Sequence, residues 1–378
     1  MPQAPKRILI VTTELGVGGA ERCVANVACG LDPTRYAVHV VALAPPPEAP
    51  RDALVRQLED VQIPLTFLGC QSKWQFLPAI SQLKRIIRET KPDVIWSFLF
   101  HANFLAAMAT RGMDIRRLQS LRVIEQGSWR RKFQSWAAKG ADRVLCVSEG
   151  VRAFAATKLR VPQDKLLVIP NGIDVEAIQP TTYAEPVDRK HRLIAVGRLD
   201  PQKDYLTMID AAARVLGSQE NWELVIIGDG PQRQPIEAAI SRHHAAESIR
   251  LIGWQADVST WLRSAEIYLL TSRWEGMPNA LIEAMAHGLP VISTDVEGVA
   301  QLLSGELAVQ VASTGQLLSG QTLLNDLIAD PALRKELGQA NRQQIEAHFS
   351  LRQMVQSYET MLNDVLSRPP GNASIPIR

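Results

Sequence analysis

The sequence predicts an α/β protein that contains two doubly wound, Rossmann-like units of similar size. Short β-branched runs alternate with helical patterns along the chain, which is typical of parallel sheets covered by helices on both faces. The alternation starts again after a polar, proline-containing stretch at 174–189. The length of 378 residues fits two or three domains, and each half is long enough for its own hydrophobic core.

The expected strands fall into two sets. Those of the first half are Ile8–Thr13, Ala37–Leu43, Ile63–Leu68, Val94–Leu99, Gln119–Glu125, Arg143–Ser148 and Leu166–Ile169. Those of the second half are Leu193–Gly197, Glu223–Ile227, Ile249–Ile252, Ile267–Thr271, Val291–Thr294 and Leu307–Val311. Ligands of open parallel sheets bind at the carboxyl ends of the strands, so we expect functional residues in the loops after strands and a site in a cleft between two facing sheets.

Charge is unevenly distributed along the chain. The whole chain has a net charge of only +2, which argues against a nucleic-acid binder that works by bulk charge. Residues 1–175 carry 24 Lys and Arg against 15 Asp and Glu, a net +9, and the remainder carries 17 against 24, a net −7. This asymmetry predicts different partners for the two halves.

Cysteines and apolar runs predict the compartment. The four cysteines, Cys23, Cys29, Cys70 and Cys146, show no metal-binding spacing, and we expect reduced thiols in a reducing compartment. The apolar run Ile8–Val11 is too short for the core of a signal peptide, and Phe98–Thr110 is too short to span a bilayer. We therefore expect a cytoplasmic protein.

A glycine-rich turn follows the first expected strand. Gly16, Gly18 and Gly19 precede a helix, but Glu21 occupies the last glycine position of a dinucleotide-binding fingerprint. The turn either exposes backbone N–H groups to an anion at the helix start or serves only close strand–helix packing.

Two cations follow the first strand of the second half. Gly197 and Arg198 come directly after the strand, and Lys203 lies five residues beyond Arg198. A guanidinium and an ammonium at a strand's carboxyl end suit a pyrophosphate, whereas the alternative is two solvated surface cations.

The segment 271–288 combines a strand end, a turn and a helix. Asn279 is the expected N-cap and Gly288 the expected C-terminal stop. Glu275 lies on the turn and Glu283 within the helix, so both carboxylates can reach the same site. Glu283 alone would be explained by the helix dipole, but its combination with Glu275 and the two cations favours a ligand site.

Together these motifs resemble the retaining glycosyltransferases of the GT-B fold, family 4, also called glycosyltransferase group 1. Glu275 and Glu283, with seven residues between them, match the family's Glu-x7-Glu signature. Four further matches occur in the expected order, from about residue 7 to 365: Gly18–Glu21, Pro170–Asp174, Gly197–Leu199 with Lys203, and Gly228–Pro231.

The resemblance implies roles for individual residues. Arg198, Lys203 and Glu275 are the expected catalytic residues. Glu283 is expected to bind the ribose of a nucleotide sugar, and Ile252 to lie beside the base. The remaining expected donor-binding residues are Gly18, Gly19, Gly197, Gly276, Met277, Pro278, Asn279 and Ala280. On the acceptor side the resemblance implies His101, while Glu125 or Gln126 stands where many members have a histidine.

The resemblance also implies the reaction. A sugar passes from a nucleotide-sugar donor, a UDP-hexose or UDP-N-acetylhexosamine, to a glycan or lipid-pyrophosphate-linked acceptor, with retention, in bacterial cell-surface polysaccharide synthesis. No Asp-x-Asp triplet occurs, so we expect neither a metal nor another cofactor. The alternatives are an inactive sugar-nucleotide-binding scaffold subunit and a GT-B sugar-nucleotide epimerase.

The expected organisation follows the charge asymmetry. Residues 1–175 form the acceptor-binding domain, 176–349 the nucleotide-sugar-binding domain, 350–368 a helix that crosses back to the first domain, and 369–378 a flexible tail. The segment 111–143 contains nine Lys and Arg, interleaved with Trp129, Phe133 and Trp136. This composition predicts a solvated helix face, a contact with a lipid-pyrophosphate acceptor, or a contact with an anionic membrane at the inner face of the plasma membrane.

Overall fold

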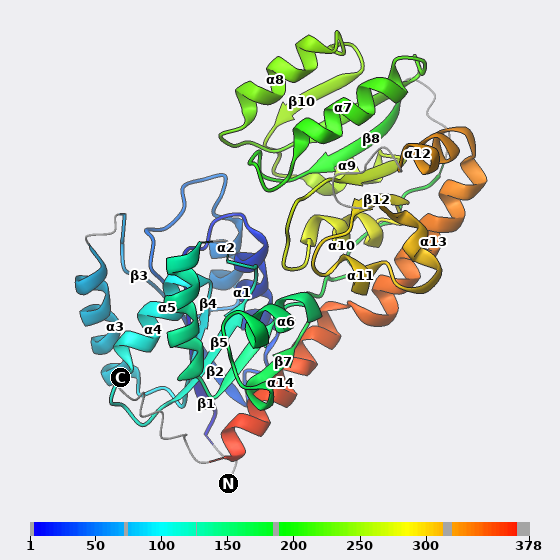
Figure 1. Cartoon of the computed structure of the whole chain (residues 1–378). Coiled ribbons are helices and arrows are strands. Elements are labelled where there is room, and N and C mark those ends of the chain that lie inside the picture. Colours follow the sequence, from blue (N-terminus) through cyan, green and yellow to red (C-terminus); the bar gives the residue numbers. More distant parts are fainter. Residues whose placement is uncertain (1–3, 72–74, 126, 184–188, 313–319, 369–378) are drawn as a thin grey trace. The chain divides into compact units, whose positions relative to one another are not determined.

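The computed structural model describes residues 4–71, 75–125, 127–183, 189–312 and 320–368. The chain divides into two compact units (Figure 1). Unit 1 contains residues 1–171 and 352–378, and unit 2 contains residues 172–351. Gln126 and the tail 369–378, both named above, lie outside the described residues.

Unit 1 is built on a parallel sheet whose strands alternate with helices. The strands are β1 (Lys6–Thr12), β2 (Tyr36–Ala42), β3 (Leu65–Phe67), β4 (Val94–Phe98), β5 (Arg116–Leu121), β6 (Arg143–Cys146) and β7 (Leu166–Val168). The helices are α1 (Gly19–Gly30), α2 (Ala53–Asp60), α3 (Phe76–Thr90), α4 (Phe100–Ala109), α5 (Ser128–Lys139), α6 (Glu149–Thr157) and the 3-10 turn η2 (Gln163–Lys165). The sheet order is β3-β2-β1-β4-β5-β6-β7.

Successive side chains of the central strand β4 point to opposite faces of the sheet, toward the two helical layers of unit 1. Ile95 is buried in a cluster with residues of α3 and α4, whereas the next residue, Trp96, makes a tilted ring contact with Tyr358, with centroids 4.9 Å apart. Because successive side chains of a strand point to opposite faces, β4 binds one helical layer on each side. The sheet is therefore buried on both faces, as expected for a doubly wound unit.

Unit 2 repeats this plan. Its strands are β8 (His191–Val196), β9 (Trp222–Ile227), β10 (Ile249–Gly253), β11 (Ile267–Leu270), β12 (Val291–Thr294) and β13 (Val311–Ala312), in the parallel order β10-β9-β8-β11-β12-β13. The helical segments are α7 (Tyr205–Leu216), α8 (Arg233–Arg242), α9 (Val258–Arg263), α10 (Asn279–Ala286), α11 (Val299–Leu302), η3 (Gly305–Gln310), α12 (Gly320–Ala329) and α13 (Pro331–His348). The central strands β8, β9 and β11 pack their apolar side chains against α7, α8 and α12.

The last helix, α14 (Leu351–Ser367), belongs to unit 1 (Figure 1). Its buried side chains are Met354, Tyr358, Met361, Leu362 and Val365, which form one stripe at three- and four-residue steps. Gly30 at the end of α1 permits close approach, because a Cβ there would lie 2.6 Å from Val355 Cγ2. This stripe is thus buried against the rest of unit 1.

Within unit 2, the segment at Ile173 pairs with the end of the chain segment that leads into α14. Ile173 N–H donates to Phe349 O at 2.9 Å, and Leu351 N–H donates to Ile173 O at 2.8 Å. These bonds connect the Pro170–Asp174 motif to the start of α14 by backbone hydrogen bonds.

Two expected strands differ from the structure. The strand predicted at Gln119–Glu125 is β5, which begins at Arg116 because the cations at its start are satisfied: Arg117 donates to Gly140 O, and Arg116 donates to carbonyls of α14 such as Val365 O at 3.0 Å. The strand predicted at Leu307–Val311 is mostly the 3-10 helix η3, and only Val311–Ala312 form strand β13. Within the described residues, none of the helices is long and apolar enough to cross a membrane.

Candidate functional site

The loop after β8 is built on two glycines of the next strand loop. A Cβ on Gly228 would lie 1.9 Å from Gly197 O, and a Cβ on Gly230 would lie 2.4 Å from Leu199 O. Leu199 N–H also donates to Asp229 O at 3.0 Å. The Gly228–Pro231 motif therefore holds the backbone that carries Arg198, because larger residues would push the two loops apart.

Lys203 and Glu275 form an ion pair between the loops after β8 and β11. Lys203 Nζ lies 2.5 Å from Glu275 Oε1, and the two side chains are only 17% and 9% exposed. Glu275 also accepts from Ser272 Oγ at 2.7 Å and from Gln202 Nε2 at 3.5 Å. Such burial strengthens the charge interaction and fixes both groups.

Arg198 is held differently. Its Nε donates to Asp200 Oδ2 at 2.6 Å, while its side chain remains 72% exposed. Asp200 is itself fixed, because its other oxygen accepts from Gln202 N–H at 3.0 Å. Most of the guanidinium is thus open to a ligand, and an anion could bind it without displacing Asp200.

Helix α10 begins at the Glu275 loop. Asn279 was predicted as its N-cap, which is wrong by one residue: the N-cap is Pro278, in extended conformation, and Asn279 is the first helical residue. The helix ends before Gly288, whose φ of +77° matches the predicted stop. Gly276, Met277 and Pro278 are buried, while Asn279 and Ala280 are partly exposed at the helix start.

Glu283 lies on α10 close to the same centre. Burial raises the pKa of Tyr268, and the neighbouring Tyr205 hydroxyl and the carboxylates of Glu275 and Glu283 raise it further. The Tyr268 hydroxyl donates to Val196 O at 3.5 Å, at the end of β8. Both carboxylates of the Glu-x7-Glu pair therefore act electrostatically on the same buried tyrosine, Tyr268.

Sequence reasoning missed Glu297, in the loop after β12. Its Oε2 accepts from Glu275 N–H at 3.1 Å. The next residue, Gly298, has a φ of +83°, and a Cβ on it would lie 2.8 Å from Gly276 O. The sequence signal that pointed to a turn here was the pair Glu297-Gly298 after an expected strand. In the fold this pair supports the backbone of the Glu275 loop.

Ile252 lies near the end of β10, half-buried, and its carbonyl accepts from Gln255 Nε2 at 3.3 Å. The neighbouring Gly253 O accepts from Gly228 N–H at 2.9 Å. This bond connects the β10 end to the glycine loop under Gly197. Ile252 therefore lies at the same edge of the sheet as the predicted donor-binding residues.

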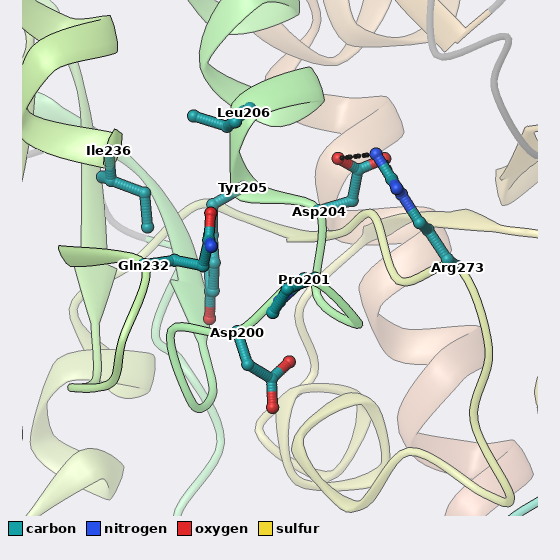
Figure 2. A pocket seen from close by; sticks show the side chains of 8 residues that line it. All are labelled: Asp200, Pro201, Asp204, Tyr205, Leu206, Gln232, Ile236 and Arg273. Atoms are coloured by element: carbon teal, nitrogen blue, oxygen red, sulfur yellow. Dashed lines mark hydrogen bonds and ion pairs between the residues drawn. The ribbon is translucent and has the colours of Figure 1, made fainter. Parts of the chain in front are cut away.

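A separate small pocket lies beside this centre (Figure 2). It has a volume of about 180 Å³ and is lined by Asp200, Pro201, Asp204, Tyr205, Leu206, Gln232, Ile236 and Arg273. Figure 2 shows the Arg273 guanidinium paired with the Asp204 carboxylate, with Nε and Oδ2 3.0 Å apart. Lys203 and Glu275 are not among the residues that line this pocket. The pocket is connected to the candidate site through Asp200, which accepts from Arg198.

In unit 1, the glycine turn opens α1. Gly18 is the extended N-cap of the helix, Gly19 is exposed in the first turn, and Glu21 is buried. A Cβ on Gly18 would lie 2.1 Å from Glu21 Oε2. The turn therefore serves close packing around Glu21 and also leaves the first turn of α1 open, so both readings of the glycines fit its geometry.

Arg130 influences both of the described residues that were predicted on the acceptor side, His101 and Glu125. Arg130 Nη1 donates to Glu125 Oε2 at 3.2 Å, and burial raises the pKa of Glu125 while Arg130 opposes that change. The pKa of His101, near the start of α4, is lowered by burial and by the same arginine. The structure thus brings His101 and Glu125 into one electrostatic environment.

Five of the nine cations at 111–143 have contacts within unit 1. Arg116 and Arg117 bind carbonyl oxygens, Arg122 donates to Asn171 and Tyr358, Arg130 pairs with Glu125, and Arg143 pairs with Asp364. Much of the positive charge of this segment is therefore used in contacts that stabilise unit 1. Only the remaining cations are available to a surface partner. Across the described ranges of the chain, no group of three or more His, Cys, Asp or Glu side chains is placed to hold a metal ion.

Known proteins match both units. The family model "Glycosyltransferase Family 4" matches residues 17–177, and "Glycosyl transferases group 1" matches residues 190–320. The amylovoran biosynthesis glycosyltransferase AmsD of Erwinia amylovora is 34% identical over 153 residues, which are 40% of this chain and 42% of that protein. The matched segment thus spans less than half the length of this relative.

Two further comparisons span most of the chain. A Campylobacter jejuni protein, N-acetylgalactosamine-N,N'-diacetylbacillosaminyl-diphospho-undecaprenol 4-alpha-N-acetylgalactosaminyltransferase, is 26% identical over 87% of this chain and 92% of its own length. The structure of Anabaena HepE in complex with UDP and glucose superposes with a TM-score of 0.83 at 18% identity, over 95% of this chain and 100% of that chain. The GT-B fold predicted from the sequence is confirmed, and the chain belongs to the family 4, group 1 type of glycosyltransferases.

Proposed function

We propose that this protein transfers a hexose or N-acetylhexosamine from a UDP-sugar to a glycan or lipid-pyrophosphate-linked acceptor, with retention of anomeric configuration. The observation that carries this proposal is the Lys203–Glu275 ion pair, which is largely buried at the strand ends of unit 2. The comparisons support a glycosyltransferase; the donor, the acceptor and the stereochemistry are our inference.

Leaving-group stabilisation is the main catalytic contribution in this proposal. Negative charge grows on the departing diphosphate as the bond to the sugar breaks. Lys203 has three donors, of which Glu275 takes one, and Arg198 donates to Asp200 through Nε alone. Both cations are therefore oriented by carboxylates and can still bind phosphate oxygens, which is the arrangement that stabilises a transition state best.

The remaining residues surround these cations. The start of α10, from Gly276 to Ala280, offers backbone N–H groups to the diphosphate and sugar, and Glu283 accepts from the ribose hydroxyls. Ile252 lies beside the base. The reaction needs no metal in this proposal, because the diphosphate charge is met by Arg198, Lys203 and a helix N-terminus.

Retention has a specific consequence. A double displacement needs a carboxylate nucleophile at the anomeric carbon. Glu275 is already engaged by Lys203, Ser272 and Gln202, so it fits the role of positioning the sugar and lysine better than that of a nucleophile. We therefore propose front-side attack by the acceptor through an ion-pair-like state, and we assign no general base.

The names of relatives support the substrate classes. One Escherichia coli relative is named UDP-Gal:alpha-D-GlcNAc-diphosphoundecaprenol alpha-1,3-galactosyltransferase, and the Campylobacter jejuni relative acts on a diphospho-undecaprenol-linked sugar by name. Both names describe acceptors carried on a membrane lipid. We accordingly propose that the protein works in bacterial cell-surface polysaccharide synthesis, in the cytoplasm and peripherally at the inner face of the plasma membrane.

A donor panel tests the proposal. Purified protein is incubated with UDP-, GDP- and ADP-sugars and a polyprenyl-diphosphate-linked sugar, and nucleoside diphosphate release is measured, followed by NMR of the product's anomeric proton. We expect release with a UDP-sugar and an α-linked product from an α-linked donor. Tight binding of one donor without any release would instead favour the inactive scaffold, and conversion of the donor sugar to its epimer would favour the epimerase.

A further inference from the structure

Unit 1 exposes a group of large apolar side chains on neighbouring helices. Trp129 is 56% and Phe133 45% exposed on α5, and Leu77 is 77% exposed at the start of α3. Helices α3 and α5 both pack against α4, so these residues belong to one region of the unit. Exposed aromatic residues that gather in this way mark an interaction surface more often than single exposed residues do.

An aromatic cluster holds this region in a defined arrangement. The Phe104 ring on α4 contacts Phe133 and Trp136 of α5, with centroids 5.1 and 5.5 Å apart, and Phe76 of α3 at 5.6 Å. Trp129 meets the edge of Phe100 at 5.6 Å. The exposed rings are therefore supported from below by other rings, and binding would cost little side-chain entropy.

All charged side chains of α5 are cationic, and two of them share a face with an aromatic ring. Lys132 and Lys139 are exposed and seven residues apart, so they lie on one face of the helix, and Trp136 lies between them on the same side. Helix α5 spans Ser128–Lys139 and contains no acidic residue. The face thus combines lysines with aromatic rings, which is the composition of helices that lie in the interface of an anionic bilayer.

We propose that this region, which we call the α5 face and define as Leu77, Trp129, Lys132, Phe133, Trp136 and Lys139, docks on an anionic lipid bilayer. The structure narrows the membrane contact from the whole segment 111–143 to this face, because Arg116, Arg117, Arg122 and Arg143 are used within unit 1. The inference identifies a partner for the proposed transferase, but docking does not require the chemistry at Lys203.

Vesicle sedimentation tests the α5 face without any donor present. The full chain is mixed with vesicles of phosphatidylglycerol and phosphatidylcholine, or of phosphatidylcholine alone, at low and high salt. We expect binding to the anionic vesicles that salt weakens. Lys132→Ala and Lys139→Ala should each weaken binding about fivefold, and Trp129→Ala with Phe133→Ala about tenfold or more. Lys158→Ala is the matched control, since Lys158 is an exposed lysine of the same unit at the end of α6.

The mutated side chains are at the surface, so we expect each variant to fold. The circular dichroism spectrum of each variant checks that the fold is retained. Equal binding of wild type and the α5-face variants would overturn the proposal, as would no binding to anionic vesicles at low salt. If the aromatic variants instead abolish a concentration-dependent dimer, the face is a protein–protein interface and the proposal is wrong. A chain that binds vesicles but transfers no sugar would contradict the proposed function alone.

Discussion

Lys203 Nζ lies 2.5 Å from Glu275 Oε1, although the two residues are 72 positions apart in the sequence. The pair joins the loop after β8 to the loop after β11, and Thr271 Oγ1 adds a second connection by donating to Lys203 O at 2.8 Å. The contact explains why a lysine at a strand end and a glutamate before a helix occur together: each fixes the other in the candidate donor site.

Removing one partner of this pair should destabilise unit 2. Glu275→Ala leaves a largely buried ammonium without its carboxylate, and we expect a loss of about 3–5 kcal/mol in the free energy of unfolding. Lys203→Met combined with Glu275→Leu removes both charges and should recover most of that loss. Urea unfolding of wild type, Glu275→Ala and the double variant measures these changes, with the exposed Lys335→Ala as control. An unchanged unfolding midpoint for Glu275→Ala would show that the pair is not formed in solution.

Asp200 should act on catalysis through Arg198. Because Arg198 is exposed, its orientation depends on the 2.6 Å bond to Asp200. Arg198→Ala is expected to lower kcat/KM about a hundredfold, and Asp200→Asn about tenfold. The double variant should be no worse than Arg198→Ala alone, since Asp200 then has nothing to position. If the losses in kcat/KM of the two single variants multiply in the double variant, Asp200 acts independently of Arg198. The exposed Arg214→Ala is the matched arginine control.

Gly228 should not tolerate a side chain. Its φ is +149°, and the Cβ of Gly228→Ala would lie 1.9 Å from Gly197 O, a backbone atom that cannot move without shifting the Arg198 loop. We expect a loss of about 2 kcal/mol or more in stability and a weakened donor affinity. Gly16→Ala is the control, because its Cβ would meet nothing within 4 Å. Thermal unfolding that is the same for the two variants would contradict the close packing of these loops.

His287 predicts a pH dependence of stability. It is fully buried between Ser259 Oγ and Gln179 O, and burial lowers its pKa from 6.5. The folded state therefore disfavours the proton that the unfolded state binds below about pH 6.5, so this stability is present above that pH and lost as the pH falls. For one proton, the free energy of unfolding changes by at most about 1.4 kcal/mol per pH unit.

Urea unfolding at several pH values measures this dependence. His287→Asn should flatten the decline between neutral and acid pH even if it lowers stability overall, and the exposed His348→Asn should leave the slope unchanged. A wild-type slope that persists in His287→Asn would assign the acid sensitivity to other groups.

The sequence predicted most of the framework because parallel strands buried on both faces appear as short apolar runs. The thirteen expected strands all have a counterpart, and the loops that follow them carry the candidate residues. Local spacing could also identify Glu275 and Glu283, which lie on one turn and helix. It could not identify Gln202, and the Glu-Gly pair at Glu297 signals a turn but not its role, because both roles depend on contacts between loops that are distant in the sequence.

Charged residues caused the main differences in unit 1. The predicted strand begins at Gln119, later than β5 does, because the long-range contacts that satisfy Arg116 and Arg117 at the strand start depend on the folded structure. The same arginines, with Arg122, suggested an entirely exposed basic segment, whereas long-range partners such as Asn171 and α14 carbonyls satisfy them. A single sequence does not show which cations have such partners.

The measurement that tests the central claim most directly is transfer of labelled sugar from a UDP-sugar to a lipid-linked acceptor by wild type, Lys203→Met and Lys335→Ala under identical conditions. Lys203 would supply charge to the leaving diphosphate. We therefore predict transfer by wild type and Lys335→Ala, and roughly a hundredfold lower kcat for Lys203→Met with an unchanged circular dichroism spectrum. Equal turnover by folded Lys203→Met would contradict the account, because the ion pair would then have no part in the reaction.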